Sequence, residues 1–179
     1  KSLWLLRRKP ELYQLGPFSD YLQKIVTEGY EIEAHVEEYL SVQTDADKYS
    51  FQSVFQTKAG LFAKADCTRK NDDGTINIYE VKSSTSVQRR SLKNQIKDAT
   101  FQKIVAEGAG FKVKSVFIIH LNGEYAREGA ISPQQLLTFS DVTAEVAALI
   151  AETREQIDTA LNLLENLAID ESSCSCLEL

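Results

Sequence analysis

The stretch GLFAKADCTRKNDDGTINIYEVKSS, residues 60–84, decides the fold of this chain because it has the pattern of a β-hairpin. Its middle, Asn71-Asp72-Asp73-Gly74, ends in Asp-Gly, which readily adopts the positive φ angles of short hairpin loops, and apolar or β-branched residues flank it. For a loop of about two to four residues, the numbers of paired residues sum to about 145–147, so Asp66 lies opposite residues 79–81. Glu80 is the acidic residue in that range, and the hairpin therefore places two carboxylates opposite each other.

The second strand of the hairpin carries charged groups where apolar groups would be expected. A period of two separates its side chains into two faces: Ile76, Ile78, Glu80 and Lys82 on one, and Asn77, Tyr79, Val81 and Ser83 on the other. Both faces include apolar residues, which predicts an inner strand that is covered on both sides. A carboxylate or an ammonium is costly in such a place unless it is paired or binds a metal.

Directly opposed carboxylates of Asp66 and Glu80, about 4.5–5.5 Å apart at Cβ, would repel each other unless a cation lies between them. A divalent metal would reverse the sign of that interaction. The alternative interpretation is a surface hairpin on which Asp66, Glu80 and Lys82 form a solvated charge network. The apolar neighbours of Glu80 argue against this alternative.

At these residues the chain resembles the PD-(D/E)XK nuclease superfamily, and more narrowly its RecB-like exonuclease branch, which includes the CRISPR-associated RecB-like nucleases. Asp66 matches the isolated Asp of the family pattern, and Glu80-Val81-Lys82 matches the (D/E)-X-K. Three further stretches supply context: Glu33 on a preceding helix, the polar helix 94–107, and HLNGEYAREG at 120–129. The last two are similar to an uncharacterised bacterial family in this branch. The resemblance covers roughly residues 29–142.

The resemblance implies a restriction-endonuclease-like core, which is an α/β fold with a mixed central β-sheet flanked by helices. We expect a single domain over residues 1–169, followed by a polar C-terminal tail at 170–179. The implied activity is the hydrolysis of DNA phosphodiester bonds, exonuclease-like and dependent on Mg²⁺ or Mn²⁺, which are hard cations suited to oxygen ligands and phosphate. The implied metal ligands are Glu33, Asp66, Glu80 and the Val81 carbonyl, and the implied catalytic residues are Asp66, Glu80, Lys82 and Gln102.

The helical carboxylate of the site has more than one candidate. A helical pattern begins near Ser19, a plausible N-cap, and places Glu33 and Glu37 four residues apart on one face. Either or both could reach inward, and His35 is an alternative. The resemblance favours Glu33 because RecB-like nucleases carry a Glu or His shortly after a helical Gly. Without the resemblance, these carboxylates would more often form a solvated helix face.

The helical residue that supplies an amide to the site also has more than one candidate. Superfamily members often carry a helical Gln just after the (D/E)-X-K strand, where it can touch substrate or a metal-bound water. Gln102 is the best match, and Asp98 and Gln95 share its side of the helix as alternatives. An ordinary amide on a helix surface is an equally good explanation for each residue alone.

The formal net charge of −6 argues against a nucleic-acid partner, but the charge is unevenly distributed. Residues 141–179 hold nine acidic groups and one basic group, whereas residues 58–103 hold ten basic and five acidic groups. The latter segment could supply a phosphate-facing field from Arg69, Lys70, Lys82, Arg89, Arg90, Lys93, Lys97 and Lys103. A solvated lysine-rich helix face is the alternative.

We single out five residues as candidate DNA contacts: Arg89, Arg90, Lys93, Tyr125 and Arg127. Tyr125 could stack on a base and Arg127 could hold a phosphate, although packing and a surface ion pair explain these two residues equally well. Whether the DNA is single- or double-stranded is left open.

The rest of the chain reads as support for the hairpin. Alternation predicts a strand at 49–57, and the apolar run at 113–121 predicts a buried inner strand with His120 as a hydrogen-bonded residue at its end. Residues 136–139 could add an edge strand. A long amphipathic helix runs from Asp141 or Thr143 to about residue 169, with an apolar stripe on one face and acidic residues on the other. This helix could cover the sheet or bind a partner protein. The stripe consists of Val146, Leu149, Ile150, Ile157, Leu161, Leu164 and Leu167.

Composition predicts a cytoplasmic protein, with no membrane-spanning segment and no secretory signal. Three cysteines without framework spacing agree with a reducing compartment. Some RecB-like nucleases hold an iron–sulfur cluster through one Cys before the first helix and three near the C-terminus. Here no Cys precedes Asp66, and Cys174-Ser175-Cys176 is spaced differently, so we expect no cluster within this chain.

Two rival interpretations belong to other functional classes. The first is a catalytically silent module that keeps the fold and binds nucleic acid or protein. The second is a structural subunit that docks through its acidic C-terminal helix.

Overall fold

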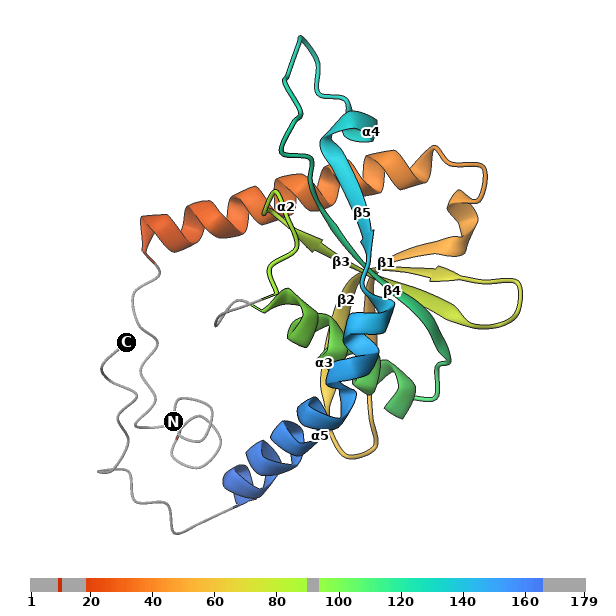
Figure 1. The fold of residues 1–179 in the computed structure, drawn as a ribbon, viewed down its shortest axis with the longest axis vertical. Helices are drawn as coiled ribbons and strands as arrows, with labels where there is room; N and C mark the ends of the chain where they lie inside the picture. Colours follow the sequence, from red (N-terminus) through yellow and green to blue (C-terminus); the bar gives the residue numbers. More distant parts are fainter. Residues whose placement is uncertain (1–9, 11–18, 90–93, 166–179) are drawn as a thin grey trace.

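The computed structural model describes Pro10, residues 19–89 and residues 94–165 of this 179-residue chain. The strands form one mixed sheet in the order β1 (Tyr49–Gln56), β2 (Phe62–Lys70), β3 (Ile76–Lys82), β4 (Val113–Leu121) and β5 (Leu137–Asp141). The helices are α2 (Asp20–Ser41), α3 (Gln95–Gly108), α4 (Pro133–Leu136) and α5 (Thr143–Glu165), with a 3-10 turn, η2 (Ala46–Lys48), before β1 (Figure 1). The predicted α/β fold with a mixed sheet and flanking helices is confirmed. The expected continuation of the last helix to residue 169 and the tail at 170–179 lie outside the described residues.

The hairpin forms in the predicted register. β2 and β3 are antiparallel, and the numbers of paired residues sum to 146, as in Cys67 opposite Tyr79. The backbone N–H of Asn71 donates to the carbonyl of Thr75 at 2.8 Å and closes the turn. Gly74 takes a φ of 78°, a conformation that glycine adopts without steric cost.

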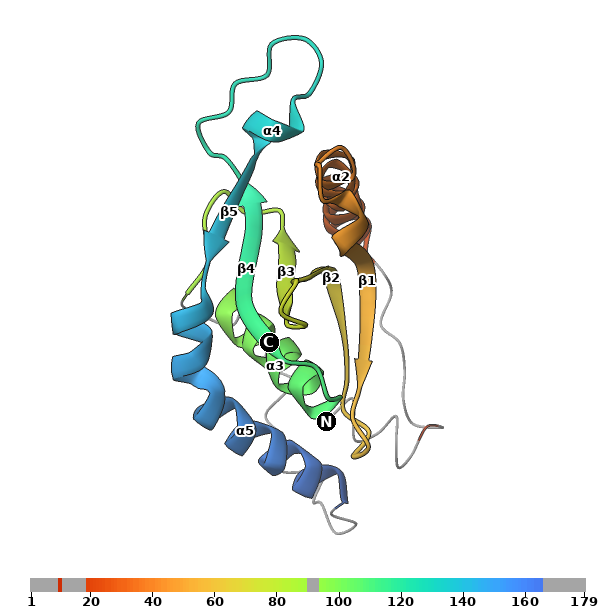
Figure 2. The same ribbon diagram turned by 90° about the vertical axis from the view of Figure 1, so that its right-hand side faces the viewer.

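Two separate hydrophobic clusters cover the two faces of the sheet. The α3-side cluster is built on Ile78, Val116 and Ile118 with residues of α3, and the α2-side cluster is built on Tyr79 and Ile119 with residues of α2. Figure 2 shows α2 on one side of the sheet and α3 with α5 on the other. Adjacent residues of β3 therefore point into different clusters, which confirms the prediction of an inner strand covered on both sides.

The connection from β3 to β4 runs through α3, and β3 and β4 are the parallel pair of the sheet. Asn94 caps α3, because its Oδ1 accepts hydrogen bonds from the backbone N–H groups of Ile96 at 3.0 Å and Lys97 at 3.3 Å. The predicted strands at 49–57 and 113–121 are β1 and β4, and the predicted edge strand is β5. At the end of β4, His120 lies 3.0 Å from the Ser140 hydroxyl, so it is the hydrogen-bonded strand-end residue that was expected.

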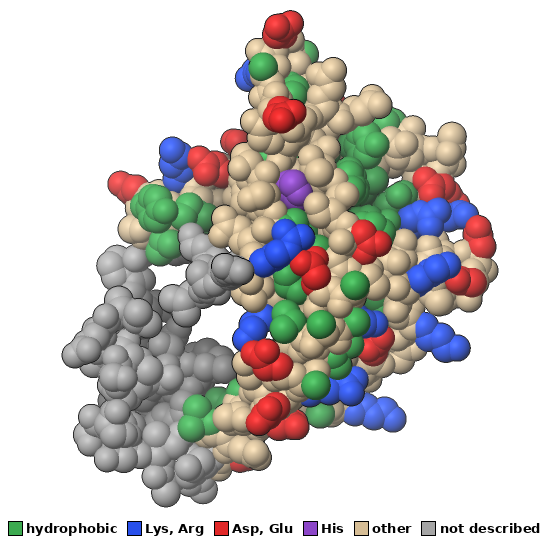
Figure 3. Space-filling view, in the orientation of Figure 1, with side chains coloured by type: hydrophobic (Ala, Val, Ile, Leu, Met, Phe, Trp, Pro, Cys, Tyr) green, Lys and Arg blue, Asp and Glu red, His purple; other side chains and the backbone are tan. Residues whose placement is uncertain are grey.

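The two long helices are buried over only part of their length. Ser19 caps α2 as predicted, and the inner half of α2 buries Ile32, Val36 and Leu40. Its outer half carries exposed apolar side chains, which Figure 3 shows gathered at that end of the helix: Tyr21, Leu22, Ile25, Val26 and Tyr30. Of the predicted apolar stripe on α5, Val146 is buried, and its other members that the structure describes are only partly covered. In the described parts of the chain, no helix is long and apolar enough to cross a membrane.

Candidate functional site

The site lies where β2 and β3 separate. Their backbone pairing ends at Cys67 and Tyr79, although both strands continue past these residues. Asp66 and Glu80 are the next residues on each strand, beyond the last pair. Asp66 Oδ2 accepts a hydrogen bond from the backbone N–H of Val81 at 2.8 Å, so a side-chain carboxylate takes the place of a ladder bond at the point of separation.

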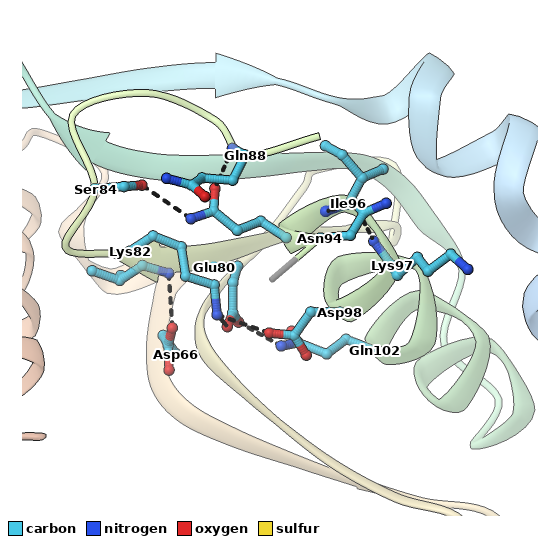
Figure 4. A network of polar contacts seen from close by, with 12 residues as sticks. Asp66, Glu80, Lys82, Ser84, Gln88, Asn94, Ile96, Lys97, Asp98 and Gln102 are labelled. Atoms are coloured by element: carbon cyan, nitrogen blue, oxygen red, sulfur yellow. Dashed lines mark hydrogen bonds and ion pairs between the residues drawn. The ribbon is translucent and has the colours of Figure 1, made fainter. Parts of the chain in front are cut away.

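Glu80 is the most buried charged residue of the site, with 6% of its surface exposed. Its Oε1 accepts a hydrogen bond from Lys82 Nζ at 2.5 Å, and its Oε2 accepts one from Gln102 Nε2 at 2.5 Å. Figure 4 shows Gln102 and Asp98 reaching Glu80 and Lys82 from α3. The structure therefore brings together Asp66, Glu80, Lys82 and Gln102, and Gln102 is the helical amide that contacts Glu80.

Lys82 lies between two carboxylates. Besides Glu80, its Nζ donates to Asp98 Oδ2 at 2.8 Å. Burial alone would lower the pKa of Lys82, but the nearby carboxylates of Glu80 and Asp98 outweigh burial and raise the pKa above its ordinary value. Lys82 is thus held as a cation in this arrangement.

For the acidic groups of the site, burial disfavours the charged form and raises the pKa. Burial, and secondly the charge of Asp66, raise the pKa of Glu80 to about 8. Burial also raises the pKa of Asp66, even though the hydrogen bond from Val81 opposes this change. Glu33 shares the trend, because burial and the charge of Asp66 raise its pKa as well. Burial is therefore the largest cause of the raised pKa in all three carboxyl groups.

Glu33 approaches the site from α2, on the face of the sheet opposite to α3. Its Oε2 accepts a hydrogen bond from Gln52 Nε2 of β1 at 2.8 Å. A pocket of about 290 Å³ opens between α2 and the sheet, and its lining includes Glu33, Glu37, Gln52, Asp66 and Val81. Of the alternatives to Glu33, Glu37 faces the same pocket, whereas the ring of His35 lies 3.5 Å from Glu38.

The residues present fit a hard divalent cation by the chemistry of their donors. Glu33, Asp66 and Val81 offer carboxylate and carbonyl oxygens around one pocket, and Glu80 adjoins them through Asp66. The buried Oε1 of Gln102 has no hydrogen-bond partner among the residues that the structure describes, which leaves one more polar atom uncompensated beside Glu80. Within residues 19–89 and 94–165, no three acidic, His or Cys side chains are already arranged around one point. Binding would therefore require Glu33 and Glu80 to turn from their present partners.

A second pocket, of about 500 Å³, adjoins Lys82 on the α3 side of the site. Its lining includes Ile25 of α2, Lys82, Ser84, Gln88 and Gln95. Gln95, an alternative for the catalytic amide, instead fixes the connection between β3 and α3. Its amide donates to Ser84 Oγ at 3.0 Å and accepts from the backbone N–H of Gln88 at 2.8 Å.

Three of the five predicted DNA contacts lie among the described residues, and each of the three contacts a group outside the site. Arg89 Nε donates to Glu145 of α5 at 2.5 Å. In the loop after β4, the Tyr125 hydroxyl accepts from the backbone N–H of Ser132 and Arg127 Nε donates to the Gly129 carbonyl, so both residues make local loop contacts. Arg90 and Lys93 lie outside the described residues.

The basic excess of residues 58–103 is largely paired with acidic groups. Besides Lys82 and Arg89, the pairs are Arg69 with Asp45, Lys97 with Glu152, and Lys103 with Glu107. Two of the six acidic partners, Glu145 and Glu152, come from α5, whose sequence is predominantly acidic. The separate basic field that the sequence suggested is therefore neutralised to a large extent in the described structure.

Two residues have roles that the sequence did not reveal. Asp98 was considered only as a substitute for Gln102, but it binds Lys82 from one turn earlier on α3, and this i, i+4 spacing is a signal that could have assigned both residues. Gln52 was not considered at all. An exposed Gln in a strand carries no signal that would predict its contact with Glu33.

Comparisons with known proteins add little to this description. No family model matches the chain, and no curated protein matches it. The crystal structure of SSO0001 is similar over 87% of this chain and 74% of that one, with 10% sequence identity and a TM-score of 0.41. Similarity at this level assigns neither a fold family nor an activity.

Proposed function

We propose that this chain is a metal-dependent nuclease that hydrolyses DNA phosphodiester bonds, with a PD-(D/E)XK core of the RecB-like exonuclease type. One observation carries the proposal. Asp66 and Glu80 adjoin at the point where two central strands separate, and Lys82 contacts Glu80 from two residues further along β3. Buried acidic groups with raised pKa values and a charged partner, beside two pockets, are typical of a site that binds an ion or a substrate.

Four groups would hold Mg²⁺ or Mn²⁺: the carboxylates of Glu33, Asp66 and Glu80 and the carbonyl of Val81. When bound, the ion supplies Lewis acidity at a phosphoryl oxygen and lowers the pKa of a water molecule. Burial already disfavours the negative charge on these carboxylates, so each of them gains from a cation nearby.

Lys82 would act on the attacking water and on the charge that develops at the phosphate. Its Nζ lies at the rim of the 500 Å³ pocket, where it can donate hydrogen bonds outward once it releases Asp98. Gln102 would orient Glu80, because its Nε2 already holds one carboxylate oxygen. Its Oε1, which has no partner within the described part of the chain, is available to accept a hydrogen bond from a water molecule.

A catalytically silent module that binds nucleic acid or protein is the second candidate. The observation that favours it is the pairing of Lys82 with both Glu80 and Asp98, together with the neutralised basic residues nearby. Such a module would keep the charge cluster as an internal network and need not bind a metal. Docking of a protein partner through the outer part of α5 is compatible with either candidate. A molecular mass in solution that increases with protein concentration would reveal self-association.

The test is a cleavage assay on end-labelled single- and double-stranded DNA with Mg²⁺, with Mn²⁺ and with EDTA. The proposal expects cleavage that depends on the metal and is lost in Glu80→Ala, together with a Mn²⁺ binding isotherm by calorimetry. DNA binding without Mn²⁺ binding or cleavage would establish the silent module instead.

A further inference from the structure

Gln52 has an unusual backbone conformation in the middle of β1. Its φ is 54°, and it is the one residue other than glycine with a positive φ in the described parts of the chain. A long side chain in the left-handed region is strained, and such strain usually persists where the surroundings require it. The side chain is exposed, so hydrophobic packing does not explain the conformation.

At this residue the alternation of side chains between the two faces of the sheet shifts by one position. On a regular strand, residues separated by an even number share a face, yet Phe51 packs with the α2-side cluster and Phe55 belongs to the α3-side cluster. The same switch occurs in β2, where Ala65 belongs to the α3-side cluster and Cys67 to the α2-side cluster. Both changes occur at one level of the sheet, because Phe51 pairs with Cys67 and Ser53 pairs with Ala65.

Asp66 lies at that level in β2, between Ala65 and Cys67, as Gln52 lies between Phe51 and Ser53 in β1. This shift in the alternation leaves Asp66 and Cys67 on the same side, both lining the pocket next to α2. A regular β1 and β2 would alternate through this point and could not present both residues there. The left-handed turn at Gln52 is therefore part of what directs Asp66 toward Glu33.

The side chain of Gln52 completes this connection. Its Nε2 donates to Glu33 Oε2 at 2.8 Å, and among the described residues no other group donates a hydrogen bond to the Glu33 carboxylate. One oxygen of Glu33 is thus fixed while the other is left without a hydrogen bond. The contact joins α2 to β1 across the pocket that Asp66 and Val81 also line.

We infer that Gln52 is a positioning residue of the site, which holds Glu33 through its amide and turns Asp66 toward the same pocket through its left-handed backbone. The inference rests on the proposed metal-dependent function, since it assigns Gln52 to the support of two ligands of one cation. Groups that orient metal ligands contribute to affinity without touching the ion, and their loss typically weakens binding by about 10- to 100-fold.

The experiment separates the amide from the backbone. Gln52→Gly keeps the left-handed conformation without strain but removes the amide, and Gln52→Asn tolerates the conformation and keeps a shorter amide. Gln56→Ala is the matched control, because Gln56 is an exposed amide on the same strand outside the pocket. Mn²⁺ affinity is measured by calorimetry, stability by the unfolding midpoint, and cleavage by single-turnover rates over a range of Mn²⁺ concentrations.

We expect Gln52→Gly to weaken Mn²⁺ binding by about 10-fold or more while its unfolding midpoint stays unchanged or rises. Its cleavage rate should recover at saturating Mn²⁺, which a general structural defect would not allow. Gln52→Asn should show a smaller loss of affinity, and Gln56→Ala should match the wild type. In a Glu33→Ala background, Gln52→Gly should have no further effect on affinity.

Wild-type Mn²⁺ affinity in Gln52→Gly would overturn the inference and leave the proposed function intact. Should the glycine variant not fold, unchanged affinity in Gln52→Asn would overturn it in the same way. A wild-type protein that binds no Mn²⁺ and cleaves no DNA would overturn the proposed function, and the inference with it.

Discussion

The β2–β3 hairpin carries acidic side chains at both of its ends, and the two ends stabilise opposite protonation states. At the turn, a hydrogen bond from Lys48 lowers the pKa of Asp72, and hydrogen bonds first from Thr75 and then from Lys114 lower the pKa of Asp73. At the open end, burial raises the pKa of Asp66 and of Glu80. One end gives its carboxylates cationic and hydroxyl partners in open solvent. The other end buries its carboxyl groups, and their hydrogen-bond partners do not outweigh the loss of water, which is the environment expected of a ligand-binding group.

The largest expected effect is on metal binding at the open end. Glu80→Ala should abolish Mn²⁺ binding, because it removes a ligand, and should leave the fold intact or more stable, because it relieves repulsion with Asp66. Lys82 keeps Asp98 as a partner, so no uncompensated charge is left behind. Calorimetric titration with Mn²⁺ and denaturant unfolding measure the two quantities. Unchanged Mn²⁺ affinity would remove Glu80 from the site.

The matched control lies at the other end of the same hairpin. Asp73→Ala removes an exposed carboxylate that is bound to Thr75 and Lys114, and it should leave Mn²⁺ affinity at the wild-type value. A loss of affinity in this variant would mean that the two ends are coupled through the strands.

The next largest effect concerns the chemical step. Lys82→Ala should keep metal and DNA affinity within a few fold but lose cleavage by roughly 10² or more, as for other positioned catalytic groups. Lys82→Arg should not restore the rate, because a planar guanidinium keeps the charge but fits poorly between Glu80 and Asp98. Single-turnover cleavage at saturating Mg²⁺ gives the answer, with Lys48→Ala at the turn as the control. A rate near wild type in Lys82→Arg would reduce Lys82 to a simple phosphate contact.

The two ends of the β2–β3 hairpin should also change the free energy of unfolding with pH in opposite directions. A carboxyl whose pKa is raised in the folded state binds more protons there than in the unfolded state, so stability falls as pH increases between the two pKa values. In the metal-free protein, the raised pKa of Glu80 places this fall in stability between its ordinary pKa and about 8, with a slope of at most about 1.4 kcal/mol per pH unit. The lowered pKa values of Asp72 and Asp73 act in the other direction, since their contribution is present at neutral pH and is lost as pH falls below about 4.

Urea unfolding from pH 3 to pH 9 tests this prediction. Glu80→Gln, which cannot ionise, should flatten the fall above pH 5, and saturating Mn²⁺ should flatten it in the wild type, because the cation stabilises the ionised form. The raised pKa of Lys82 acts only at more alkaline pH and does not enter this window. A metal-free stability that is constant or increases from pH 5 to pH 8 would contradict the assignment of a raised pKa to Glu80.

The smallest expected effect is on stability at the turn. Lys114→Ala removes the ammonium that reaches Asp73 at 3.0 Å, but both groups are exposed and such pairs contribute little. We expect a slight decrease of the unfolding midpoint that disappears at high salt, with no change in Mn²⁺ affinity. A decrease that persists in high salt would show that Lys114 stabilises the turn through packing contacts rather than through its ion pair with Asp73.

The sequence predicted the hairpin and the central part of the site because both depend on local rules. The Asp-Gly turn fixed the register, and the period of two placed Glu80 and Lys82 on the face toward α3 and Val81 on the other. Helical spacing placed Gln102 and Asp98 on one side of α3, although it could not say which of them would contact Glu80.

Other features depend on contacts between distant segments and had no local signal. Arg89 and Lys97 were read as free cations, but their partners Glu145 and Glu152 are more than fifty residues away on α5. The left-handed backbone of Gln52 is equally unpredictable, since Gln has no preference for that conformation and the reason for it lies across the sheet in Asp66 and Glu33.

The site is assembled from one continuous part of the chain. The hydrogen bonds that define it join residues no more than 22 positions apart: Gln52 to Glu33, Val81 to Asp66, Lys82 to Asp98 and Gln102 to Glu80. Short separations cost little loop-closure entropy and favour rapid contact formation. All of the residues in these contacts have therefore been added to the chain once Gln102 is synthesised, whereas β4, β5 and α5 are synthesised later. A chain cut in the loop between β4 and β5 would keep every one of these groups on a single fragment.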